Sequence, residues 1–99
     1  MFRSIKTAEQ AAQEKLDIER KSMVVSMRQA RLALAQQGLL PLVEDAIALI
    51  PEPDQSKIKI EWEYASTVER NSVWVSILQP AFNLSDEQMD DLFKLAATL

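Results

Sequence analysis

Three short patterns of the form Ser/Thr-x-x-Gln mark helix starts, and they constrain this fold more than any other feature of the sequence. The three patterns are Thr7 with Gln10, Ser26 with Gln29, and Ser85 with Gln88. In such a capping box the hydroxyl accepts a hydrogen bond from a first-turn backbone amide, and the glutamine side chain bonds back to the capping residue. Each pattern precedes a run of good helix formers. The sequence therefore predicts an all-α fold.

The apolar spacing predicts a small helical domain of about five helices with an extended N-terminal helix. The 99 residues suffice for one domain, so we assign residues 1–22 to an N-terminal helical extension and 23–99 to a single compact domain. The first four expected helices are residues 7–22, 26–37, 41–50 and 57–68, and Gly38 ends the second of them. A fifth helix is expected between a cap at Asn71 or Ser72 and an end at Pro80, and a last helix begins at Ser85. The first two could also run together through Met23–Val25.

Residues 57–64 allow two interpretations. Lysines and glutamates alternate there with Ile58, Ile60, Trp62 and Tyr64, the pattern of a half-buried strand. A lone strand would leave its backbone groups unpaired, and we find no second strand-like run in the chain. The same segment presents a helical face that continues to Val68. We therefore predict a helix; a strand here would have to pair with another chain.

The expected N-terminal helix has only a narrow apolar stripe, formed by Ala8, Ala12 and Leu16. Such a helix is either solvated on all sides or ordered against a partner or a second copy. Two arginines three residues apart, Arg28 and Arg31, share one face of the next helix and form a second candidate contact.

Enzymatic chemistry finds little support in the composition. The chain has no cysteine, no histidine and one glycine, which excludes thiol and imidazole catalysis, Cys/His zinc sites and glycine-rich phosphate loops. The acidic run at 86–91 could form a carboxylate metal site, in which Asp86 and Asp90 lie one turn apart. The helix dipole already explains Asp86 and Glu87, and an oxygen-ligand site would need more ligands from a loop, so we expect no metal here. We predict no enzyme, no catalytic residue, no metal and no cofactor.

The charge distribution also limits the classes of binding partner that we expect. The net charge is −4, and residues 54–99 carry four cations against eight anions. Nucleic acids and anionic membranes both require a basic surface, so neither is an expected partner. No segment approaches the roughly 20 apolar residues of a membrane span. We expect the protein in the cytoplasm where it is made.

Large apolar side chains are the remaining candidates for a binding surface. Tryptophan and tyrosine dominate the energetics of protein interfaces, although core packing is their default use. We favour Trp74, or Tyr64 together with Ile60, over Trp62. The complete set of predicted partner-binding residues is Ile60, Tyr64, Trp74, Leu16, Arg28 and Arg31.

Residues 23–99 resemble small tail-region proteins of tailed bacteriophages and prophages. The motifs that carry this resemblance are the segment 26–40 with its Gly-Leu-Leu step, the Trp-Glu-Tyr-Ala segment at 62–65, the charged element 68–72, and Leu-Ser-Asp-Glu-Gln-Met-Asp-Asp-Leu-Phe-Lys-Leu-Ala-Ala-Thr-Leu at 84–99. The resemblance implies an all-helical domain with a structural role in the tail or in tail-fibre assembly. It brings no catalytic residues.

We therefore expect a tail-associated structural or assembly protein that contacts a tail or fibre protein, copies of itself, or both. It would reside in the host cytoplasm during assembly or in the virion tail. An alternative is a small acidic phage-encoded inhibitor or regulator of a host protein, because an acidic surface can occupy a basic one.

Overall fold

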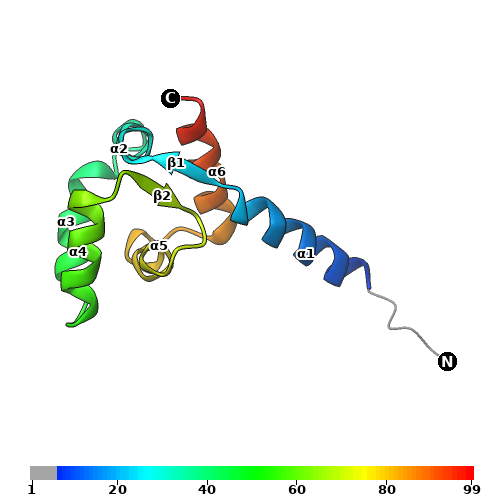
Figure 1. Ribbon diagram of the computed structural model, residues 1–99, viewed down its shortest axis with the longest axis horizontal. Coiled ribbons are helices and arrows are strands. Elements are labelled where there is room, and N and C mark those ends of the chain that lie inside the picture. Colours follow the sequence, from blue (N-terminus) through cyan, green and yellow to red (C-terminus); the bar gives the residue numbers. More distant parts are fainter. Residues whose placement is uncertain (1–6) are drawn as a thin grey trace.

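The computed structural model describes residues 7–99, which form six α-helices, two 3₁₀ helices and one two-stranded sheet. The elements in chain order are α1 (Ala8–Lys21), β1 (Val24–Ser26), α2 (Met27–Gln36), η1 (Leu40–Leu42), α3 (Val43–Ala48), α4 (Asp54–Tyr64), β2 (Thr67–Glu69), α5 (Val73–Leu78), η2 (Gln79–Phe82) and α6 (Asp86–Ala97). In Figure 1, α2 to α6 surround the small sheet, whereas α1 projects away from them. The predicted predominantly all-α class is confirmed.

Helices α1, α2 and α6 begin at the three predicted capping boxes, and both hydrogen bonds of each box are present. At α6, the Ser85 hydroxyl accepts from the Gln88 backbone amide at 3.1 Å, and the Gln88 side-chain oxygen accepts from the Ser85 amide at 2.9 Å. The predicted end of α2 is also present. Gly38 adopts a φ of 72°, and the Leu39 amide donates to the Leu34 carbonyl at 2.8 Å, which closes the helix.

The capping box of α6 leads to a stability prediction. We expect Ser85→Ala to lower the free energy of unfolding by about 1 kcal/mol, because the amides of the first turn lose their acceptor. Ser85→Gly should cost only a few tenths of a kcal/mol, since glycine leaves the helix end open to water. Urea denaturation followed by circular dichroism measures both variants. Equal costs for alanine and glycine would contradict this account of the cap.

The alternative of one continuous helix through Met23–Val25 is wrong, because residues 24–26 form β1. This strand pairs antiparallel with β2, with Val25 opposite Val68, and both of these side chains are buried. Two further backbone bonds extend the pairing: the Arg70 amide donates to the Met23 carbonyl and the Met27 amide to the Ser66 carbonyl, each at 2.9 Å. The β-branched valines suit this extended geometry.

The helix predicted for residues 57–64 is confirmed as α4, but its predicted continuation to Val68 is wrong. The helix ends at Tyr64, and Ala65 is extended, so that Val68 lies in β2. Ile58 and Trp62 lie one turn apart on the buried face, while Ile60 and Tyr64 lie one turn apart on the exposed face. The alternation in the sequence thus reflects two apolar faces of one helix.

The expected boundaries of the helix after Asn71 need two corrections. Ser72 occupies the position before α5, but its hydroxyl donates to the Glu69 carbonyl at 2.7 Å and does not cap the helix. Pro80 does not end the regular structure, because the chain continues through it as η2. Proline is tolerated there since a residue in the first turn needs no intrahelical donor.

The core consists of two apolar clusters on either side of α2. One joins the sheet to α6 through Val25, Val68 and Phe93. The other joins α3, α4 and α5, with Ile58 and Trp62 at its centre. Trp74, Met27 and Leu92 pack against both clusters, so the body formed by residues 23–99 is continuous.

Candidate functional site

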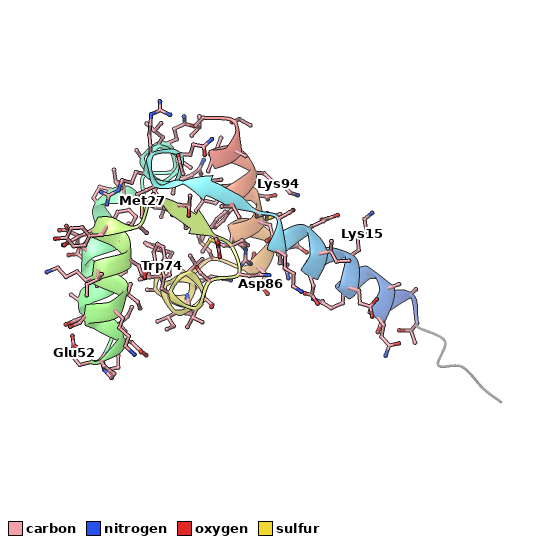
Figure 2. The ribbon with its side chains drawn as sticks, viewed as in Figure 1. Lys15, Met27, Glu52, Trp74, Asp86 and Lys94 are labelled. Atoms are coloured by element: carbon pink, nitrogen blue, oxygen red, sulfur yellow. The ribbon has the colours of Figure 1, made fainter. Side chains whose placement is uncertain are left out.

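Helix α1 is the most exposed element of the described chain. None of its 14 residues is buried. Figure 2 shows its side chains, Lys15 among them, standing clear of the body. The predicted stripe of Ala8, Ala12 and Leu16 is exposed, and so is Ile18, which is 69% accessible and lies outside that stripe. A helix of this length is marginal in water without tertiary contacts, so α1 is the element that gains most from a binding partner.

The base of α1 is fixed to the body by a buried carboxylate. Arg20, near the end of α1, donates from Nε to both oxygens of Asp90 at 3.1 Å and from Nη2 to Oδ2 at 2.9 Å. Arg70 follows β2 and is only 5% exposed; its Nε donates to Asp90 Oδ1 at 2.9 Å. One α6 carboxylate therefore connects α1, the sheet and α6.

A second carboxylate, Asp86, extends this cluster toward the surface. Its Oδ1 accepts from Gln79 Nε2 at 2.8 Å and lies 3.4 Å from Arg70 Nη2. Figure 2 shows Asp86 near the junction of α1 with the body. We call Arg20, Arg70, Asp86 and Asp90 the junction cluster. It holds two positive and two negative charges, so the charges at this junction balance.

The pKa values of both carboxylates follow from these contacts. Burial alone would raise the pKa of Asp90, but the hydrogen bonds and charges of Arg20 and Arg70 outweigh burial and hold it below the usual value. The hydrogen bond from Gln79 is the largest cause that lowers the pKa of Asp86. The hydrogen bond to Asp90 raises the pKa of Arg20. All three groups are thus charged at neutral pH and serve as ion-pair partners.

Sequence reasoning missed the junction cluster. It considered Asp90 only as a possible metal ligand beside Asp86, although Asp90 follows the buried Met89 and stands three residues before the buried Phe93. That position on the buried face was the available signal, since a buried carboxylate needs a cationic partner. Which arginines supply it depends on contacts across 20 and 70 residues of sequence.

The prediction that Arg31 shares an open face with Arg28 is wrong. Its guanidinium stacks over the Trp62 ring at 4.0 Å from the ring centre, and its Nη2 donates to the Trp62 carbonyl at 2.6 Å. This contact joins α2 to α4 and combines a cation–π interaction with a hydrogen bond. Arg28 itself is exposed.

The other predicted partner residues fall into separate places. Ile60 and Tyr64 come together on the outer face of α4, where they are 56% and 78% exposed. Trp74 is half-buried between the two core clusters. Leu16 lies on α1, which Figure 1 places at the opposite end of the molecule from α4. The structure thus presents two separate exposed apolar surfaces, on α1 and on α4.

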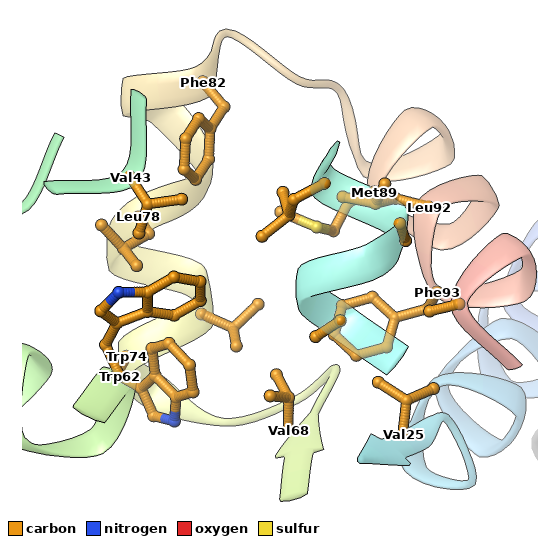
Figure 3. A pocket seen from close by; sticks show the side chains of 15 residues that line it. Val25, Val43, Trp62, Val68, Trp74, Leu78, Phe82, Met89, Leu92 and Phe93 are labelled. Carbon is orange, nitrogen blue, oxygen red and sulfur yellow. The ribbon is translucent and has the colours of Figure 1, made fainter. Parts of the chain in front are cut away.

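An apolar cavity of about 60 Å³ lies between the two core clusters. In Figure 3, Trp62, Trp74 and Phe82 stand on one side of it, and Met89 and Phe93 on the other. Its lining consists of aliphatic, aromatic and methionine side chains. It offers no titratable group, and such cavities remain dry because a water molecule needs several polar partners.

Within residues 7–99, no helix is both long and apolar enough to cross a bilayer, and no three acidic side chains gather in a way that could hold a metal ion. Comparison with protein-family models, with curated proteins and with solved structures gives no match to this chain.

Proposed function

We propose that this chain is a structural or assembly protein of a bacteriophage or prophage tail, and that it acts through protein–protein contacts with α1 as its docking helix. The observation that carries this proposal is a 14-residue helix that buries no residue, yet is fixed at its base by the junction cluster. The likeness of residues 23–99 to tail-region proteins supports the tail context.

The junction cluster favours a docking role because it orients α1 before any partner arrives. Arg20 makes three hydrogen bonds to Asp90, which limits the directions in which the helix can leave the body. Preorganisation reduces the entropy lost on binding. A partner that covers Leu16 and Ile18 would also remove exposed apolar surface from water, at about 25 cal/mol per Å².

Co-expression with the tail and fibre proteins of the same phage or prophage tests this proposal. We expect the wild-type chain to co-elute with at least one of them on size-exclusion chromatography with light scattering. Leu16→Gln with Ile18→Gln should abolish co-elution and leave the helical circular dichroism unchanged, because glutamine retains helix propensity.

Val73→Gln is the matched control, since Val73 lies on α5 and is 74% exposed, close to the 69% of Ile18. This variant should still co-elute with the partner. The proposal is overturned if the wild-type chain co-elutes with none of the tail proteins, or if the α1 double variant binds them as well as the wild type.

A further inference from the structure

A groove of about 290 Å³ runs between α3 and α4, at the end of the molecule remote from α1. The groove is lined by the apolar side chains of Ile47, Ala48 and Trp62 and by the carboxylates of Glu44 and Glu63. Gln55 and Lys59 complete the lining from α4, and Gln55 Nε2 donates to the Ala48 carbonyl at 3.0 Å. Within residues 7–99, neither Glu44 nor Glu63 forms an ion pair, so both carboxylates remain available to a ligand.

The groove lies in an acidic part of the chain. Residues 43–64 contain six anionic and two cationic side chains, a net charge of −4 that equals the net charge of the whole protein. Leu49, directly after α3, and Ile60, on α4, are both exposed. An occupant of this surface should therefore combine positive charge with apolar side chains.

The chain itself contains a segment of that composition. Residues 1–6, Met-Phe-Arg-Ser-Ile-Lys, carry two cations, no anion and three apolar side chains. This segment directly precedes α1 in the sequence, and α1 lies at the end of the molecule opposite the groove. Figure 2 shows the two ends, with Lys15 on α1 and Glu52 beside α4.

The segment cannot reach the groove of its own molecule. Six residues span at most about 20 Å when fully extended, whereas the long axis of the molecule is 54 Å. Any contact between the two is therefore made between copies. Because the two surfaces differ, such a contact is heterologous, and repeating it builds a ring or an open chain of subunits.

We propose that residues 1–6 of one copy bind in the α3–α4 groove of a second copy. Arg3 and Lys6 face the carboxylates of Glu44 and Glu63, while Phe2 and Ile5 supply the apolar contact with the groove and its edge. The contact is head-to-tail, uses a surface other than the one that docks on tail proteins, and does not rest on the proposed tail role.

Two single-sided variants of the full-length chain test the proposal by sedimentation velocity at low and high salt. The wild type should show an average mass that rises with concentration and falls with added salt, because exposed charge pairs are screened. Arg3→Glu with Lys6→Glu reverses the charge of the segment, and Glu44→Lys with Glu63→Lys reverses the charge of the two groove carboxylates. Each variant alone should be monomeric, with association weakened about tenfold or more.

Mixing the two variants makes the test specific. The groove variant retains the wild-type segment 1–6, which can bind the wild-type groove of the segment variant. The reversed segment and the reversed groove also carry opposite charges and attract each other. The mixture should therefore regain association through both kinds of contact. A third chain that carries both reversals should associate as the wild type does, because every charge pair is restored with opposite sign.

Glu69→Lys with Asp91→Lys is the matched control, since both acids are exposed and lie outside the groove. This variant should associate like the wild type. A wild type that remains monomeric at about 1 mM, near the limit of weak association, overturns the proposal, and so does association that the groove variant leaves unchanged. Co-elution with tail proteins is measured separately, so failure here leaves the role of α1 intact.

Discussion

Replacing Asp90 by alanine should lower the free energy of unfolding by about 3–5 kcal/mol. The substitution leaves Arg70 buried with only the long contacts to Asp86, at 3.4 and 3.5 Å, and releases Arg20 from the body. An uncompensated buried charge is among the most destabilising defects in a protein interior. Urea denaturation followed by circular dichroism measures the loss.

Asp91→Ala is the matched control for this prediction. It removes the neighbouring carboxylate from the same helix, but Asp91 is exposed. Its effect should stay within about 0.5 kcal/mol, as for ordinary surface substitutions. If Asp90→Ala costs no more than Asp91→Ala, then the junction cluster does not contribute to stability.

The same carboxylate makes stability depend on pH. The pKa of Asp90 in the folded protein lies below its ordinary value of 3.8, so the unfolded chain takes up a proton first as the pH falls. The contribution of Asp90 is therefore complete only well above the ordinary pKa of 3.8 and is lost as the pH falls through the lower, folded-state pKa. Asp90→Ala should show a shallower loss of stability in this acidic range than the wild type.

Replacing Trp62 by alanine should also lower the free energy of unfolding by about 3–5 kcal/mol. Trp62 is 6% exposed and packs in the cluster that joins α3, α4 and α5. Its loss leaves a void beside the existing 60 Å³ cavity and removes the ring on which Arg31 stacks. Chemical denaturation followed by far-ultraviolet circular dichroism avoids the change in tryptophan fluorescence.

Tyr64→Ala provides the comparison within the same helix. Tyr64 lies two residues further along α4 but faces outward, so its removal should change stability by no more than about 0.5 kcal/mol. If Trp62→Ala and Tyr64→Ala lower the free energy of unfolding by similar amounts, then α4 does not have one buried and one exposed apolar face.

Some features of this protein follow from short-range interactions that the sequence displays directly. The capping boxes at Thr7, Ser26 and Ser85 each act over three residues, and all three are present in the structure. Gly38 ends α2 because a left-handed residue is needed there. Residues 57–64 form a helix whose alternation reflects a buried and an exposed apolar face.

The tertiary structure decided the features that depend on distant partners. Val25 lies in a strand because Val68 pairs with it across more than 40 residues, and neither short segment shows a strand pattern by itself. Asp90 is buried because Arg20 and Arg70 converge on it from two other elements. Local backbone hydrogen bonds depend on neighbours in the chain and can be inferred from them. The burial of a charge or the pairing of a three-residue strand depends on which surfaces the folded chain brings together, because only those contacts offset the cost of desolvation.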